Sequence, residues 1–265
     1  MIQTLGQGLQ HRACPRSFLI VAVMAVAAVG VQAASDSWKM DTAGNWDLGS
    51  NWTSGSAPGY ASGFGDSNST DVATFAGTLT TLRTVTVDAN RNIGGITISN
   101  NPSANRYTLQ SGSLLLSNGG KILEDGANGA HTDVISTPIT IMGNSGSATF
   151  ANNATLSTCV LSLTGAISGN ATAGNVTTLT LNGTNTGLNV LSTSAVSDGA
   201  NGGKLAIVKN DTGQWRLLGN NTFSGGVTLN TGSFGLGSFA NCLGTGTFTI
   251  NGGQITQLNA EGFPF

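Results

Sequence analysis

The chain has 265 residues and a formal net charge of −2, from 10 Lys and Arg against 12 Asp and Glu. This balance excludes the strongly basic surface with which proteins bind nucleic acid. Charged residues are 8% of the chain, against about 25% in ordinary globular domains, and glycine occurs 39 times. A hydrophobic content of 39% excludes a disordered chain. Hydroxyl, amide and backbone groups must therefore keep the protein in solution.

Residues 1–33 have the organisation of a secretory signal peptide. Arg12 and Arg16 precede a short apolar run from Phe18 to Val31, and small residues follow, with Ala33 at a suitable cleavage position. A membrane-spanning helix needs about 20 apolar residues, so this run is too short to be one. We expect cleavage after Ala33, a secreted or cell-surface location, and no membrane span in the remaining chain. The alternative is an uncleaved signal anchor.

Residues 34–80 form a Trp-rich segment that contains Trp38, Trp46 and Trp52. Tryptophan covers a large apolar area, and the end of a repeat stack must be closed, so the favoured interpretation is a buried N-terminal cap. The alternative is that the rings are exposed and stack on sugars. In that case the three residues would form a carbohydrate-binding site.

An oxygen-rich stretch lies near the end of this segment, with Asp66, Asn68, Thr70 and Asp71. Calcium takes about six to eight oxygen ligands, and this stretch offers few carboxylates. We therefore expect a solvated loop and no bound metal. No cofactor is expected elsewhere in the chain.

Residues 81–265 alternate apolar residues with threonine over short stretches that end in Asn, Ser or Asp. Examples are Val85–Val87, Ile96–Ile98, Leu179–Leu181 and Phe248–Ile250. Alternation with a period of two places successive side chains on opposite faces, which is typical of a half-buried strand. Asn and Gly tolerate the left-handed backbone that turns need. The region is therefore predicted to be all-β.

These strands recur in a shared order. Val227–Leu236 aligns with the segment that starts at Phe248 and also with Tyr107–Leu116. The offset from Val227 to Phe248 is nearly the same as the offset from Val85 to Tyr107. A period of about 20–50 residues is typical of a repeat architecture.

We predict a parallel β-helix, in which Val227 stacks on Phe248 and Asn230 on Asn251, with neighbouring strands about 4.8 Å apart. Ladders of uncharged residues stack without repulsion, which explains the low charge. The alternative is a β-sandwich or barrel, because short strands at regular spacing suit those folds too.

Residues 215–255 carry the clearest repeat. Gly219–Gly226 reads Gly-Asn-Asn-Thr-Phe-Ser-Gly-Gly, and after a strand comes Leu243–Gly246, which reads Leu-Gly-Thr-Gly. This resembles the autotransporter-associated β-strand repeat, with Phe223 in the place of a tyrosine. The resemblance implies a right-handed parallel β-helix that is displayed at the cell surface as a passenger domain.

Candidate catalytic groups are sparse. His131 and Asp133 lie close together in the sequence, but no serine can be singled out to complete a triad, and a loop histidine is the favoured interpretation. Glu124 and Asp125 would face opposite sides of a strand, whereas glycoside cleavage needs two converging carboxyls. We therefore predict that the protein is not an enzyme.

Two cysteines, Cys159 and Cys242, would remain after removal of the signal peptide. They either form one disulfide bridge or stay as two buried thiols, and the sequence leaves both possibilities open.

These patterns together predict a secreted or cell-surface, adhesin-like structural protein whose partners are cell-surface or extracellular components, including glycans. The alternatives are a carbohydrate-binding all-β module and, third, a polysaccharide-degrading β-helix enzyme, which rests on analogy of fold alone. The C-terminal stretch Gln254–Asn259 is uncharged and strand-like, so we also expect self-association through the last coil.

Overall fold

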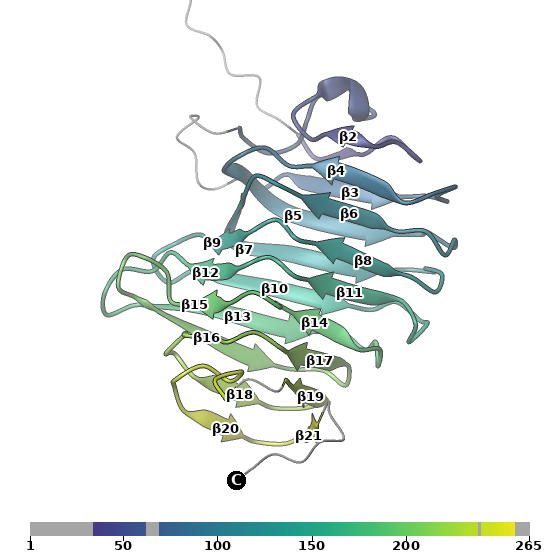
Figure 1. The fold of residues 1–265 in the computed structure, drawn as a ribbon. Helices are drawn as coiled ribbons and strands as arrows, with labels where there is room; N and C mark the ends of the chain where they lie inside the picture. The colour runs from purple at the N-terminus through teal and green to yellow at the C-terminus, as the bar shows by residue number, and fades with distance from the viewer. Residues whose placement is uncertain (1–33, 62–68, 238–239, 258–265) are drawn as a thin grey trace, which may run out of the picture. The chain divides into compact units, whose positions relative to one another are not determined.

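The computed structural model describes residues 34–61, 69–237 and 240–257, so the predicted signal peptide lies outside the described residues. The described chain is a parallel β-helix, as predicted. It winds in successive coils whose strands stack in order from β2, in purple, to β21, in yellow (Figure 1). These residues also contain one short 3₁₀ helix, η1 (Gly49–Asn51). Within the described ranges we find no helix with the length and apolar character that a membrane span requires.

The strands form two large sheets. The twelve-stranded sheet comprises β1 (Asp36–Ser37), β3 (Val72–Ala76), β5 (Arg91–Ser99), β7 (Leu114–Asp125), β9 (Ile139–Ile141), β10 (Ser147–Asn152), β12 (Ile167–Gly169), β13 (Val176–Asn182), β15 (Val196–Ser197), β16 (Lys204–Lys209), β18 (Val227–Leu229) and β20 (Phe248–Ile250). The nine-stranded sheet comprises β2 (Gly44–Asn45), β4 (Arg83–Thr86), β6 (Tyr107–Gln110), β8 (Thr132–Ile135), β11 (Val160–Leu163), β14 (Asn189–Leu191), β17 (Gln214–Leu217), β19 (Ser233–Leu236) and β21 (Gln254–Gln257). Every pairing between these strands is parallel, so the alternative of a β-sandwich or barrel is wrong.

Each middle coil contains three strands. The chain runs from a strand of the nine-stranded sheet to a short strand and then to a longer one, as in β8, β9 and β10. The short strands β9, β12 and β15 pair with one another and with the first part of β7, and so form a third face. In the described part of the chain, this face has no named strand after β15, and the last coils contain two strands each.

The inward-facing side chains of successive coils form apolar ladders. One ladder of the nine-stranded sheet contains Leu109, Ile135, Leu163, Leu191 and Leu217, all buried. The predicted stacking of Val227 on Phe248 is confirmed, because the two residues are register partners in the parallel pair β18–β20. A coil cannot bury its own apolar face, so each rung is covered by the coils on either side.

The period of the helix changes along the chain. The sequence offset between hydrogen-bonded rungs is 28 at Leu161 and Asn189, in the middle coils, and 21 at Asn230 and Asn251, in the last coils. The strand pairs β8–β11 and β19–β21 have registers with the same two offsets. The shorter period that Val227 and Phe248 indicate therefore belongs to the C-terminal coils.

The predicted alignment near the N-terminus is wrong for the same reason. Val85 pairs with Leu109, and Tyr107 pairs with Arg83 instead. Tyr107–Leu116 passes from the nine-stranded sheet to the twelve-stranded sheet, whereas Val227–Leu236 passes in the opposite direction. The two segments share the order strand, turn, strand, but they occupy different corners of the coil.

The corners of the C-terminal coils are tight. Gly232 has φ +76°, and a Cβ added there would lie 2.3 Å from the carbonyl oxygen of Asp211, so only glycine fits. Beside it, the Asn251 amide donates to the Asn230 amide oxygen at 2.8 Å, and Asn230 donates in turn to Asn210. The predicted stacking of Asn230 on Asn251 is thus confirmed, and these uncharged amides continue the hydrogen bonding between coils.

Candidate functional site

The three tryptophans of the N-terminal segment lie in the apolar core. Trp38, Trp46 and Trp52 are 2%, 0% and 0% exposed. Their rings surround Phe75 at centroid distances of 5.7–5.8 Å, and Trp52 contacts the other two tryptophans at 5.0 and 5.1 Å with edge-to-face geometry. The indole N–H groups donate to the carbonyls of Thr42, Pro58 and Trp46.

This arrangement has a direct consequence for sugar binding. The three tryptophan side chains are almost completely buried, so in this structure they are not open to a ligand. Carbohydrate binding by Trp38, Trp46 and Trp52 stays a prediction, and it would require this segment to open.

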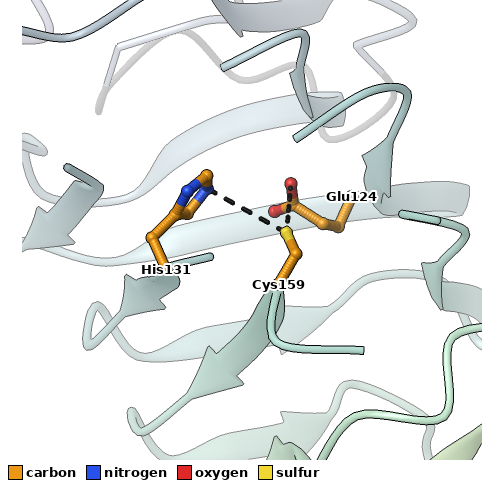
Figure 2. A group of neighbouring side chains, drawn as sticks. All are labelled: Glu124, His131 and Cys159. Carbon is orange, nitrogen blue, oxygen red and sulfur yellow. Dashed lines mark hydrogen bonds between the residues drawn. The ribbon is translucent and has the colours of Figure 1, made fainter. Parts of the chain in front are cut away.

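The described residues bring titratable side chains together at one buried corner, between β7 and β8 on one coil and before β11 on the next (Figure 2). The cluster, which we term the corner cluster, consists of Glu124, His131, Asp133 and Cys159. None of the four is more than 6% exposed. Glu124 faces inward near the end of β7 while Asp125 faces out, as strand alternation predicts. Strand register places Cys159 next to His131, because Val160 pairs with Thr132.

The atoms of the corner cluster lie close to one another. Cys159 Sγ is 3.6 Å from Glu124 Oε1 and 4.0 Å from His131 Nε2 (Figure 2). His131 Nε2 also lies 2.8 Å from Asp133 Oδ2, and His131 Nδ1 lies 2.9 Å from the carbonyl oxygen of Ser103. A carbonyl can only accept, so Nδ1 carries a hydrogen and the ring is held with Nε2 toward the other three groups.

Two carboxylate oxygens in this corner are buried without a hydrogen-bond partner, Glu124 Oε2 and Asp133 Oδ2. The contact of Asp133 Oδ2 with His131 is close in distance but lacks hydrogen-bond geometry. Buried polar atoms are nearly always paired, so two unpaired oxygens in one cluster require an explanation.

Burial and charge decide the protonation of the cluster. Burial, followed by the charge of the nearby Asp133, raises the pKa of Glu124 well above its ordinary value. Burial, followed by the charges of Glu124 and Asp133, raises the pKa of the Cys159 thiol. For His131, burial lowers the pKa, but the close carboxylate of Asp133 and the hydrogen bond to the Ser103 carbonyl outweigh it and raise the pKa. Without a bound cation these shifts favour the neutral thiol, the neutral form of Glu124 and the protonated form of His131.

This geometry does not support nucleophilic catalysis. In a triad one imidazole nitrogen faces the nucleophile and the other faces the acid, whereas here Nε2 faces both Cys159 and Asp133. The thiol is also held in its unreactive protonated form. Glu124 and Asp133 do converge, which the sequence did not reveal, but neither is exposed, so a polysaccharide has no path to them.

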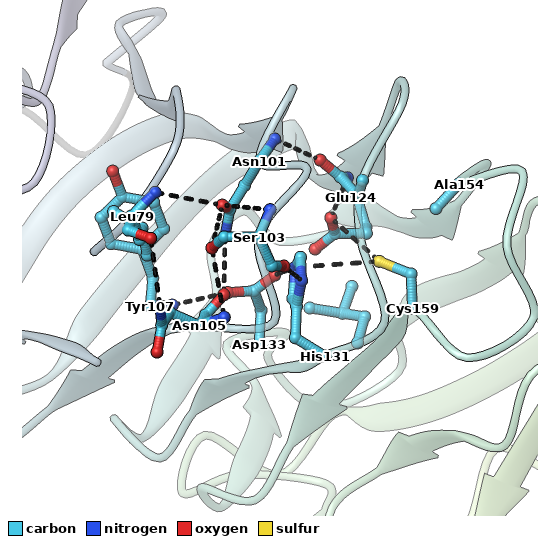
Figure 3. Close-up of polar contacts among 12 residues, drawn as sticks. Leu79, Asn101, Ser103, Asn105, Tyr107, Glu124, His131, Asp133, Ala154 and Cys159 are labelled. Carbon is cyan, nitrogen blue, oxygen red and sulfur yellow. Dashed lines mark hydrogen bonds and ion pairs between the residues drawn. The ribbon is translucent and has the colours of Figure 1, made fainter. Parts of the chain in front are cut away.

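Asparagines surround the corner cluster and hold its turns in place (Figure 3). Asn128 donates to Glu124 Oε1 and, at 2.9 Å, to the carbonyl of Asp125. The Asn101 backbone N–H donates to Asn128 Oδ1 at 2.8 Å, and Asn101 donates to the carbonyl of Asn105. The turn that carries the cluster is therefore fixed to the coil before it.

Asp133 has a counterpart two coils further on. Its Oδ1 accepts the backbone N–H of Tyr107 at 2.7 Å, and Asn189 Oδ1 accepts the backbone N–H of Leu161 at 3.0 Å. In both cases the side chain caps the residue one rung earlier in the same ladder. An asparagine is sufficient for this capping role, so capping alone does not explain the carboxylate at position 133.

The remaining predicted groups lie apart from this corner. Cys159 and Cys242 are both free and buried, so the structure favours two thiols over a bridge. His131 lies in the loop between β7 and β8, as predicted, but its ring is buried and lies 2.8 Å from Asp133 Oδ2. Of the oxygen-rich stretch, Asp66 and Asn68 lie outside the described residues, and Asp71 accepts the backbone N–H of Gly59.

Comparison with known proteins gives one short similarity. A 61-residue stretch is 44% identical to the Adhesin BmaC autotransporter of Brucella suis biovar 1 (strain 1330), and it covers 23% of this chain and 2% of that protein. No family model and no solved structure matches the chain. The similarity supports a relation to autotransporter passengers, while membership of the repeat family named above stays a prediction.

Proposed function

We propose that the chain is an adhesin-like passenger segment, exported through its signal peptide and displayed at the cell surface or secreted, with a structural and binding role. The observation that supports this most directly is the 44% identical stretch in an autotransporter adhesin. The parallel β-helix agrees with it, because stacked coils present a long lateral surface to extracellular partners.

Export and adhesion can be tested in one system. A Gram-negative host that produces the full chain should release or display a form that begins at Ala34 and is accessible to added protease. Cells that carry it should bind extracellular matrix or epithelial cells better than cells with a Val23→Arg variant, whose interrupted apolar run blocks export. Cytoplasmic retention of the uncleaved wild type, or equal binding by both strains, would contradict the proposal.

The carbohydrate-binding alternative has less support. Among the described residues, the exposed large apolar side chains are all aliphatic, so no aromatic platform for sugars is evident there. Glycan-array binding that is lost in Trp52→Ala but kept in Phe150→Ala would favour this alternative. The second variant controls for damage to the core, because Phe150 is equally buried.

The polysaccharide-degrading alternative rests on the convergence of Glu124 and Asp133, and their burial counts against it. We expect the purified chain to show no turnover of polysaccharides. Turnover that Glu124→Gln abolishes would overturn this expectation.

We further propose that a second copy of the chain covers the last described coil in the purified protein. Leu229 and Phe234 are fully buried, yet their ladder partners in the last coil, Ile250 and Ile255, are 55% and 45% exposed. Stacking of another coil would bury both residues and give β20 and β21 a second parallel neighbour, which neither strand has among the described residues.

Sedimentation of the purified chain tests this contact. The wild type should associate at high concentration, and a variant with Ile250→Lys and Ile255→Lys should not. The control carries Leu156→Lys and Leu188→Lys, which change similarly exposed leucines in turns of the middle coils. A monomeric wild type, or equal loss of association in the control, would argue against the proposal.

A further inference from the structure

The corner cluster combines three kinds of metal ligand in one buried place. Glu124, His131 and Cys159 each offer one ligand atom, and these atoms all lie within 4.8 Å of one another. Asp133 Oδ2 lies 2.8 Å from His131 Nε2, and we take it as the candidate for a fourth ligand. A thiolate, an imidazole and carboxylates suit zinc, whereas calcium and magnesium prefer oxygen ligands alone.

The distances fit one tetrahedral ion. Zinc bonds of about 2.0–2.3 Å place neighbouring ligand atoms about 3.3–3.8 Å apart. Cys159 Sγ lies 3.6 Å from Glu124 Oε1 and 4.0 Å from His131 Nε2, so these pairs need shifts of a few tenths of an ångström at most. His131 Nε2 and Asp133 Oδ2, now 2.8 Å apart, must separate by about 0.5 Å when both bind the ion.

The surroundings prepare His131 for coordination. Its Nδ1 donates to the Ser103 carbonyl at 2.9 Å, which leaves the Nε2 lone pair directed at the other ligands when the ring is neutral. Histidines that bind metals almost always donate their second ring nitrogen in this way. Asn128 similarly orients Glu124 by donating to its Oε1.

The alternative is a polar cluster that only holds the coil corner together. Two observations argue against it. Glu124 Oε2 and Asp133 Oδ2 are fully buried without a hydrogen-bond partner, and a cation held between the two carboxylates would offset this burial. At the equivalent position two coils later, the uncharged Asn189 caps the preceding rung equally well.

We propose that this corner binds one zinc ion through Cys159, His131, Glu124 and Asp133. All four positions are protein side chains, so the site is structural and leaves no coordination position for a substrate. Glu124, His131 and Asp133 flank one corner of the stack, and Cys159 lies at the same corner one turn of the helix later, so the ion would cross-link two successive turns.

The test uses the purified full chain, refolded from denaturant with Zn²⁺ or Co²⁺ because the site is buried in the folded state. After gel filtration we expect about one metal ion per chain. We also expect the absorption bands of a tetrahedral cobalt–thiolate complex, and a melting temperature that falls by about 5 °C when a chelator is present during refolding.

Two cysteine variants separate the site from adventitious binding. Cys159→Ser should lose the cobalt–thiolate absorption and most of the metal, and Cys242→Ser should keep both, because Cys242 is the other buried free thiol. If Cys159→Ser does not fold, Asp133→Asn and the chelator experiment on the wild type decide the question. A wild type that retains no metal, or a Cys159→Ser variant with an unchanged spectrum, would overturn the proposal.

Discussion

The middle coils and the last coils solve the same packing problem in different ways. The coil from Thr132 to Val160 is long, and its extra length forms a third strand and a long turn before the nine-stranded sheet. The coil from Gln214 to Ser233 is much shorter and closes with a glycine-containing turn. Long turns must satisfy buried polar groups, and they do so with side-chain networks, whereas short turns leave little space for such groups.

The ladders make this comparison testable through core deletions. Phe150 is buried between Ile122 and Leu181 in the middle coils, whereas Phe248 is half-buried and has a described ladder partner on one side only, Val227. We expect Phe150→Ala to lower the free energy of unfolding by about 3–5 kcal/mol, because a cavity forms between two rungs. Phe248→Ala should cost about 1 kcal/mol, because a half-exposed ring leaves no closed cavity.

Urea denaturation followed by circular dichroism measures both losses. Similar losses in the two variants would contradict the view that the last coil is less completely covered than the middle ones. Hydrogen exchange of β18 in Phe248→Ala provides a local control, since only the end of the stack should lose protection.

The buried hydrogen bonds of Asn189 lead to a second prediction, with a slightly smaller loss of stability. Asn189 donates to the Gln214 carbonyl at 3.0 Å and accepts from the Leu161 backbone N–H and from Asn152. Asn189→Asp would place a carboxylate there without a neighbouring cation, whereas Asp133 has His131. We expect a loss of about 3 kcal/mol at pH 7, because the buried charge is uncompensated.

The pH dependence identifies the cause of this loss. Burial should raise the folded-state pKa of the new carboxyl above its unfolded value of about 3.9, so the penalty is present at neutral pH and disappears as the pH falls toward 4. Asn201→Asp at an exposed position is the control and should change stability by less than about 0.5 kcal/mol. A pH-independent loss in Asn189→Asp would point to the lost donor rather than the charge.

The two regions also differ in how well the sequence predicts them. The stacking of Val227 on Phe248 was predictable because the last coils are short, nearly constant in length and marked by glycine and asparagine at each corner. The coils before them vary in length, so the offset from Val85 to Tyr107 does not mark a stacked pair, and Val85 pairs with Leu109 instead. The parallel fold was therefore predictable, and the register of the middle coils was not.

The corner cluster was hidden by the same difference. Glu124, His131 and Asp133 are each visible in the sequence, but strand alternation says nothing about a turn that bends His131 back into the core. Cys159 joins them only through the longer register of the middle coils, and no stretch of the sequence displays that period clearly. A search for polar residues at inward positions of successive rungs would have found Asp133 and Asn189, because both interrupt an apolar ladder.

Lys209 lies where the long coils give way to the short ones. It belongs to an inward ladder between Leu181 and Leu229, and its ammonium group donates to the carbonyls of Asp211 at 2.7 Å, Asn210 and Thr231. Burial, only partly opposed by the charge of Asp211, lowers the pKa of Lys209 to about 8. The three carbonyls at this junction therefore do not fully replace the water that the ammonium group loses.

Replacement of Lys209 by methionine should show this cost as a pH-dependent difference in stability. The folded-state pKa lies below the unfolded value of about 10.4, so the unfolded chain binds more protons between about pH 8 and 10.4, and the free energy of unfolding of the wild type rises across that range. The free energy of unfolding of the Lys209→Met variant should not rise over this pH range. The gain in free energy of unfolding of the variant over the wild type should therefore be largest at or below about pH 8 and should disappear by about pH 10.4. The relief of the buried charge contributes at most about 3 kcal/mol to this gain, and the loss of the three hydrogen bonds to carbonyls reduces it. Paired urea titrations from pH 7 to 10.5 measure the difference directly, with the exposed Lys204→Met as the control for general alkaline effects. A difference that stays constant over this range would mean that Lys209 keeps an ordinary pKa, and that the junction between long and short coils is hydrated.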